Sequence, residues 1–258
     1  MALLKPILDH YQQLALIIAP NPLQQNKFSH FHAGPTCSHM SKYKTLYRMK
    51  LRILWPGLRI YVTAWVKGCA HCLSYNVWRN RRQELHFSWP VTISFYIMDV
   101  DLWDSGTYFS KNSAGRHLLN FMCDLMQLVA YNITTETHVE HLANLFMENI
   151  ALSFGMVAIL VVNAIFRFKS VFKDMCTALG IIYWPLSHGN HKGKSIEKYH
   201  RFLRKRQEIA SQDRGTHDVF LHNYKTSHFA WNNAPIDGTD ILRSVTAIDR
   251  ELRFLLDV

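Results

Sequence analysis

The sequence predicts an α/β protein in which a mixed sheet is covered by helices and is preceded by a small helical metal-binding segment. Two observations lead to this fold class. Strand-like segments at Thr92 to Val100, Tyr108 to Phe109, His117 to Met122 and Leu125 to Tyr131 are followed by alternating helical and β-branched segments up to Trp231, an order typical of a mixed sheet with helices on its faces. Upstream, two histidines and two cysteines stand in short-spaced pairs.

The chain has enough apolar residues for a core and carries a strong positive charge. Apolar residues make up 48% of its 258 residues, and the formal net charge is +10. The composition excludes wholesale disorder. The charge favours a polyanionic partner, either nucleic acid or an anionic membrane surface, and says nothing about the fold.

The N-terminal part contains a candidate zinc site. His32-x6-His39 is followed by Trp55-Pro56-Gly57 and then by Cys69-x2-Cys72. Zinc takes four nitrogen or sulfur ligands in a tetrahedron, and two short-spaced pairs supply them. Helical patterns over 41–54 and 58–66 would bring the pairs together. The nearby His30, Cys37 and His71 are alternative ligands.

The cysteines predict a reducing compartment. There are five, an odd number, with one close pair beside histidines, which favours metal binding over a disulfide framework. The N-terminal apolar run Leu14 to Ala19 is too short for a signal peptide. We therefore expect an intracellular protein, of the nucleus or the cytoplasm.

The segment Ile150 to Phe166 is nearly long enough to cross a bilayer. Gly155 divides it and Asn163 is polar, while its second part is short and β-branched. We interpret it as a helix that stops at the glycine, followed by a strand buried on both faces. We therefore expect no membrane partner.

Changes in pattern along the chain divide it into four parts. We expect an N-terminal helix and connector at 1–27, a zinc-binding domain at 28–82, a core domain at 90–212 and a C-terminal helical extension at 213–258. Gln83 to Pro90 has the composition of a linker.

Further motifs follow in an order that resembles a retroelement integrase, of the long-terminal-repeat retrotransposon and retrovirus group. Besides the His and Cys pairs, they are Thr134-Thr135-Glu136-Thr137, Leu142 to Asn149, Val161-Val162-Asn163, Gly189 to Arg201 and Ala230 to Pro235. The resemblance implies a ribonuclease H-like core with a mixed five-stranded sheet. It also implies DNA cleavage and strand transfer with Mg²⁺ or Mn²⁺ held by two aspartates and a glutamate.

Carried over onto this sequence, the catalytic acids fall at Asp101, at the end of the first long strand, and at Asn163 and Glu197. Asp99 is an alternative for the first acid, and Glu197 has the alternative role of capping its helix beside Ser195. Asn163 stands where the family has an aspartate, so one charge of the cation site is missing. We expect catalysis to be weak or absent.

Two basic clusters are candidates for DNA contact. The residues that we expect to bind nucleic acid are Arg79, Arg81, Arg82, Lys192, Lys194, Lys198 and Arg201, and the second cluster continues through Arg204, Lys205 and Arg206. Such a face neutralises phosphates with little sequence readout, although a solvated charged face is the commoner meaning of such a run. Tyr199, His200 and Trp231 either stack on bases or pack in the core.

Three functions remain open at this stage. The chain is an integrase-type polynucleotidyl transferase that works as a multimer on DNA ends, an inactive DNA-binding remnant of one, or a zinc-stabilised protein with no DNA role. Metal-dependent joining of a labelled DNA end and salt-sensitive DNA binding separate them.

Overall fold

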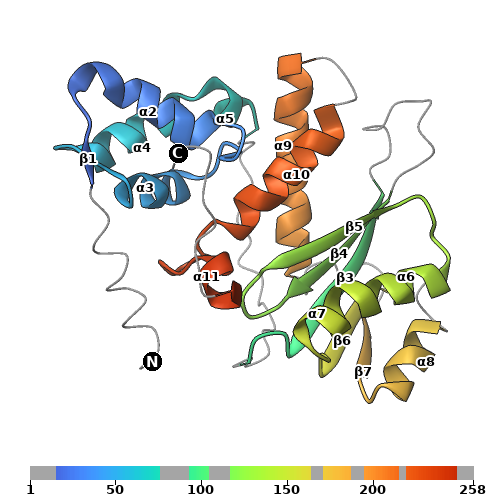
Figure 1. Cartoon of the computed structure of the whole chain (residues 1–258). Coiled ribbons are helices and arrows are strands. Elements are labelled where there is room, and N and C mark those ends of the chain that lie inside the picture. The colour runs from blue at the N-terminus through green and yellow to red at the C-terminus, as the bar shows by residue number, and fades with distance from the viewer. Residues whose placement is uncertain are drawn as a thin grey trace. The chain divides into compact units, whose positions relative to one another are not determined.

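The computed structural model describes residues 16–75, 93–104, 117–163, 171–186, 195–214 and 219–248 (Figure 1). These residues form two compact units. The first contains 16–75 and 237–240, and the second contains 93–236 and 241–248 within the described ranges. Each unit has its own apolar core. The predicted linker at 83–90 lies outside the described residues.

The first unit is helical with a two-stranded parallel ribbon. Its elements are β1 (Ile17–Ile18), α2 (Asn21–Ala33), α3 (Lys42–Lys50), β2 (Ile53–Leu54), α4 (Leu58–Gly68) and α5 (Ala70–Tyr75). The hydroxyl of Ser41 caps α3 by accepting from the Lys44 amide. Gly57, with φ 79°, supplies the left-handed turn that starts α4. The two helices predicted between the ligand pairs are therefore present as α3 and α4.

A buried aromatic and aliphatic cluster holds these helices together. It is built from Ala19, Phe28, Phe31, Met49, Ile53, Trp55, Leu58 and Val62. Helix α3 ends four residues before the end predicted for it, because Ile53 and Leu54 pair with β1 instead. Helix α2 runs across the domain boundary predicted at residue 28.

The second unit is a five-stranded mixed sheet. Its strands are β3 (Ile97–Asp104), β4 (His117–Cys123), β5 (Val129–Thr134), β6 (Ile159–Asn163) and β7 (Ile182–Leu186). Their order is β5-β4-β3-β6-β7, with β3, β4 and β5 antiparallel and both β6 and β7 joined in parallel. The predicted mixed five-stranded sheet with flanking helices is confirmed.

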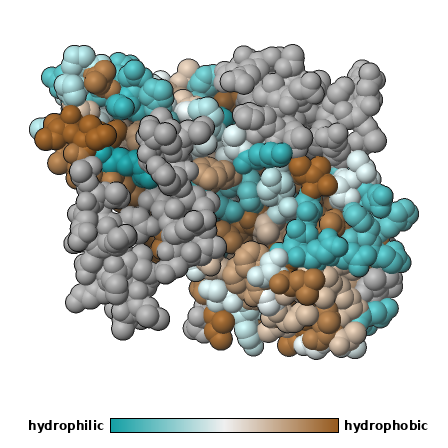
Figure 2. All heavy atoms as spheres, in the orientation of Figure 1, coloured by the Kyte–Doolittle hydropathy of each residue, from teal (hydrophilic) through white to brown (hydrophobic). Residues whose placement is uncertain are grey.

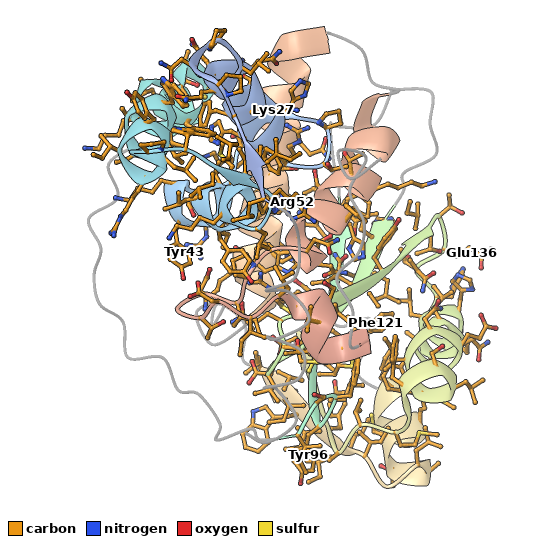
Figure 3. All side chains as sticks on the ribbon, turned by 60° about the vertical axis from the view of Figure 1, so that its left-hand side comes forward. Lys27, Tyr43, Arg52, Tyr96, Phe121 and Glu136 are labelled. Carbon is orange, nitrogen blue, oxygen red and sulfur yellow. The ribbon has the colours of Figure 1, made fainter. Side chains whose placement is uncertain are left out.

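Helices cover both faces of this sheet. They are α6 (Val139–Phe146), a π-helical turn (Met147–Ala151), α7 (Leu152–Phe154), α8 (Val171–Ala178), α9 (Ile196–Arg214), α10 (Val219–Asn232) and α11 (Arg243–Ile248). Helices α6 and α8 pack on one face. There Phe121 of β4, labelled in Figure 3, lies with its ring centroid 5.9 Å from that of Phe146. Helices α9 and α10 pack on the other face around Trp103, Leu118 and Tyr224.

The alternation of side chains along β3 decides which residues meet α9. Met98 and Val100 enter the core under α6, so Asp99, Asp101 and Trp103 project to the opposite face, toward α9. The strand was expected to end at Val100, with Asp101 at its tip. That prediction was wrong, because pairing with β4 continues through Asp104 and places Asp101 in mid-strand.

Other local predictions have mixed outcomes. Gly155, with φ 92°, ends α7 as expected, and Leu160, Val161 and Val162 of β6 are buried. The strand expected at Leu125 begins only at Val129, because a turn with Gln127 at φ 53° precedes it. A strand expected at Tyr108 lies outside the described residues. Across the described ranges, no helix has the length and apolarity of a membrane span.

Candidate metal centres and nucleic-acid interface

The structure brings His32, His39, Cys69 and Cys72 together at one end of the helical unit. His32 lies in the last turn of α2. The turn after α2 passes through Ser38 and His39, both with positive φ, and the His39 amide donates to the His32 carbonyl at 2.8 Å. Cys69 follows α4 directly, and Cys72 lies in α5. The two residues of each pair therefore lie close together in space.

The four donor atoms have the spacing of a tetrahedral zinc site. Sγ of Cys69 lies 3.4 Å from Nδ1 of His39, and Sγ of Cys72 lies 3.4 Å from Nε2 of His32. All four donor atoms lie within 4.8 Å of one another. A tetrahedron with the usual Zn–N and Zn–S lengths has nitrogen–sulfur edges of about 3.5 Å. The type of the four residues and their two shortest nitrogen–sulfur distances therefore fit a zinc site.

A hydroxyl behind His32 orients its ring. Nδ1 of His32 lies 3.2 Å from Oγ1 of Thr45, which is fully buried on α3 and donates in turn to the Met40 carbonyl. A proton on Nδ1 that is donated to Thr45 leaves the Nε2 lone pair for a metal. His32 thus turns Nε2 toward the cluster, whereas His39 turns Nδ1.

The alternative ligands lie outside this cluster. Cys37 is buried but is not among the four converging residues. His71 places its ring centroid 5.2 Å from that of His39 without joining the set. Within the described part of the chain, the two His and two Cys are the one group of three or more His, Cys, Asp or Glu donors that is close enough for a metal.

On the sheet unit, Asp101 meets the start of α9. Its Oδ2 lies 3.4 Å from Nδ1 of His200, and the His200 side chain is only 2% exposed. His200 stands three residues after Glu197 on α9, so one helical turn separates Glu197 from the residue that contacts Asp101. The strand acid and the first turn of α9 are therefore neighbours.

Asp99 has a different partner, which separates its role from that of Asp101. Its carboxylate is buried and accepts from the backbone amide of Ile196, the first residue of α9, at 3.3 Å. The Ser195 hydroxyl donates to Asp124 at 2.5 Å. Two carboxylates thus stabilise the positive end of the helix. Asp99 rather than Glu197 accepts the Ile196 amide.

Glu197 lies at the edge of the site. Its side chain is 26% exposed, and its Oε1 is 3.9 Å from a guanidinium nitrogen of Arg204, two turns along α9. Such a half-exposed pair contributes little to stability. The carboxylate is therefore accessible at the surface beside the buried Asp101–His200 contact.

Asn163 ends β6 next to the Asp101 strand. Val162 is the register partner of Val100 in the parallel β3–β6 pair, and Asn163 and Asp101 each follow one residue later. Only the backbone of Asn163 falls within the description. The backbones of Asp101 and Asn163 therefore reach the same level of neighbouring strands.

The sequence interpretation missed His200 and Asn120 as parts of this region. His200, Tyr199 and Trp231 are buried, so the core interpretation of these three aromatic residues is confirmed. Asn120 is the register partner of Asp101 on β4 and is fully buried. A polar residue inside the apolar run of β4, Leu-Leu-Asn-Phe-Met, was the available signal.

The basic cluster of α9 divides in two. Arg201 and Arg204 are exposed and Lys198 is half-exposed, whereas Arg206 is buried. Arg206 therefore does not belong to the exposed basic face. The other expected contact residues, Arg79, Arg81, Arg82, Lys192 and Lys194, lie outside the described residues.

Comparison with known proteins agrees with this architecture. Residues 19–78 match the family model of the integrase zinc-binding domain. A chain of the cryo-EM structure of the simian T-cell lymphotropic virus intasome in complex with PP2A regulatory subunit B56 gamma matches with a TM-score of 0.54 at 11% identity, over 86% of this chain and 75% of that one. The HTLV-2 integrase catalytic core domain in complex with magnesium gives a TM-score of 0.44 at 15% identity, over 59% of this chain and 96% of that one. No curated protein matches the sequence.

The chain is similar to integrases in two respects. Residues 19–78 form an integrase zinc-binding domain, and the chain shares its fold with the intasome chain. The predicted resemblance to retroelement integrases is confirmed.

Proposed function

We propose that the chain is an integrase-like DNA-binding protein of a retroelement whose strand-transfer chemistry is weakened by Asn163. The observation that carries this proposal is the contact between Asp101 and His200 of α9, which brings a strand acid beside the helix that carries Glu197 in its first turn. Metal-assisted phosphoryl transfer needs divalent cations at the reacting phosphate, and we propose that carboxylates from this strand and this helix hold them.

Asp101 and Glu197 would hold the divalent cations, with Asn163 offering one neutral oxygen. When bound, Mg²⁺ or Mn²⁺ activates the attacking hydroxyl and stabilises the leaving oxygen. Replacing a third carboxylate by an amide removes about 4 kcal/mol per unit of cation charge at 4 Å and an effective dielectric near 20. A barrier raised by that amount slows the reaction about a thousandfold.

The zinc-binding domain and the basic helix supply the DNA-binding part of the proposal. Zinc held by His32, His39, Cys69 and Cys72 would be structural, because four protein ligands leave no open position. Arg201 and Lys198, with the basic residues at 79–82 and 192–194, would neutralise backbone phosphates. By analogy with the intasome, we propose assembly of several copies on DNA ends, in the nucleus or the cytoplasm. The predicted domain bounds, 28–82 and 90–212, stay part of this proposal.

A joining assay tests the proposal and its main alternative. Purified protein is incubated with a labelled DNA end in Mg²⁺ and in Mn²⁺, and its DNA affinity is measured at several salt concentrations. We expect salt-sensitive binding together with slow, metal-dependent joining. Binding without joining in either metal supports the inactive remnant, which the Asn163 substitution favours. A chain that shows no salt-sensitive binding contradicts both.

A further inference from the structure

A continuous series of hydrogen-bonded side chains, all buried except the partly buried His228, runs from the end of α10 to Asp101, entirely within the sheet unit. Its members are Asn232, His228, Tyr199, Tyr224, Asn120 and His200. Each is linked to the next by a hydrogen bond of 2.7 to 3.3 Å, and His200 contacts Asp101. The donor and acceptor at each link can be deduced from one fixed end.

The fixed end is Asn232. Its Oδ1 accepts from the Val129 amide at 3.0 Å, and its Nδ2 donates to the Val129 carbonyl at 2.8 Å. A backbone amide only donates and a carbonyl only accepts, so the orientation of this side-chain amide is unambiguous. The second hydrogen of Nδ2 is then available to Nε2 of His228, 3.1 Å away. Nε2 of His228 must accept.

His228 determines which way the tyrosine hydroxyls point. Burial lowers the pKa of His228 to about 3, so the ring is neutral at physiological pH. With Nε2 accepting, its single proton sits on Nδ1 and is donated to Oη of Tyr199 at 3.2 Å. Burial raises the pKa of Tyr199 and of Tyr224, so each phenol keeps its one hydrogen. Tyr199 then donates to Tyr224, and Tyr224 donates to Oδ1 of Asn120 at 2.7 Å.

The orientation of the Asn120 amide decides which ring nitrogen of His200 accepts a hydrogen bond. Because Oδ1 accepts from Tyr224, Nδ2 faces Nε2 of His200 at 3.1 Å and the Leu118 carbonyl at 3.4 Å. Nδ2 is a donor only, so Nε2 of His200 accepts. The proton of the His200 ring therefore belongs to Nδ1, which faces Oδ2 of Asp101.

We propose that this one-way hydrogen-bond chain makes His200 a neutral Nδ1–H donor that positions the Asp101 carboxylate. His200 acts through Asp101 and is not itself a cation ligand, because its Nε2 lone pair is taken by Asn120 and its Nδ1 carries hydrogen. Its importance for cation binding rests on the proposed function, whereas its tautomer does not.

The first test is direct observation of the histidine tautomers. Long-range ¹H–¹⁵N spectra of the full chain with ¹⁵N-labelled histidine distinguish a proton on Nδ1 from one on Nε2. We expect both His200 and His228 to carry it on Nδ1. A proton on Nε2 of His200, in the unaltered protein, overturns the proposal whatever the variants do.

Two tyrosine variants then test whether the hydrogen-bond series determines the tautomer of His200. Tyr224→Phe removes the donor to Asn120, and we expect His200 to become a mixture of tautomers. Tyr131→Phe is the matched control, because its ring packs against Tyr224 and His228 while its hydroxyl is not a link of the chain. An unchanged His200 tautomer in a folded Tyr224→Phe variant overturns the proposal.

The last test measures Mn²⁺ binding by calorimetry. We expect His200→Leu to weaken it about tenfold, the usual effect of losing a hydrogen bond to a metal-binding side chain. His200→Asn, whose Nδ2 can donate from the place of Nδ1, should restore most of the affinity. Equal losses in both variants contradict the positioning role. If the unaltered protein binds no Mn²⁺, the proposed function fails while the tautomer result still decides the hydrogen-bond chain.

Discussion

The two units both gather polar side chains around a candidate cation position, but they do so by different means. In the helical unit, all four donor atoms come from two short-spaced pairs and lie within 4.8 Å of one another. In the sheet unit, Asp101 contacts a series of hydrogen-bonded side chains that reaches Asn232, which lies 131 residues further along the sequence (232 − 101). A site made of local pairs is visible in the sequence, whereas a site supported by long-range contacts needs the fold.

The largest expected effect is loss of the zinc site. Cys72→Ser should unfold the helical unit, because structural zinc supplies on the order of 10 kcal/mol of folding free energy. Zinc content, with NMR signals of Trp55 and Trp65, measures the result. Cys37→Ser is the matched control, since Cys37 is equally buried and lies outside the cluster. If both variants lose the same stability, the zinc assignment is wrong.

Restoring the missing charge should have the next largest effect. Asn163→Asp is expected to tighten Mn²⁺ binding by up to about a thousandfold, the equivalent of about 4 kcal/mol. Calorimetry of the full chain measures the gain. Asn144→Asp, at an exposed position of α6, adds the same charge away from the site and should leave affinity unchanged. No difference between the two variants would mean that residue 163 does not face the cation.

Acid should destabilise the sheet unit through His228. Its pKa is about 3 in the folded protein, below the ordinary value of 6.5. The unfolded chain binds the additional proton below pH 6.5, so stability is complete above that pH and falls as the pH drops toward 3. Between pH 6.5 and pH 5 we expect a loss of about 2 kcal/mol.

Urea unfolding followed by NMR signals of the sheet unit measures this loss. His228→Gln should flatten the dependence on pH, while His138→Gln, at an exposed position, should not. An unchanged slope in His228→Gln would assign the acid sensitivity to other groups.

The smallest expected effect concerns the basic surface of α9 that we propose to bind DNA. Arg201→Ala should weaken DNA binding and reduce the slope of log affinity against log salt by about 1, as for one phosphate contact. Fluorescence anisotropy at several salt concentrations measures it. Lys173→Ala, exposed on α8 on the opposite face of the sheet, is the control. Equal slopes for both variants would remove α9 from the interface.

The sequence was sufficient for the fold class and for the residues that converge at the zinc site. Helical spacing placed α3 and α4 between the pairs, and the order of strands and helices predicted the mixed sheet. It could not place Asp101 within β3, because the extent of a strand depends on its partner, and β4 continues the pairing through Asp104. It could not reveal the contacts of His200 either, since this helical residue meets Asn120 of β4 and Asp101 of β3, both distant in the sequence.

The sequence alone also does not identify which apolar side chains are exposed. Figure 2 shows hydrophobic residues on the described surface, and Ile60, Leu152 and Ile182 are each more than half exposed. Their spacing in the sequence resembles that of core residues, and only the packing distinguishes them.

Strand β3 carries two carboxylates on one face, and both contact α9. Asp99 accepts a hydrogen bond from the amide of Ile196, and Asp101 contacts the ring of His200. Because these two contacts fix both the position and the rotation of α9, the side-chain alternation of β3 also determines where Glu197 lies. On the proposed function, Asn163 weakens the chemistry without affecting these two contacts, so Asn163→Asp would add a charge to a site whose other residues are already in position.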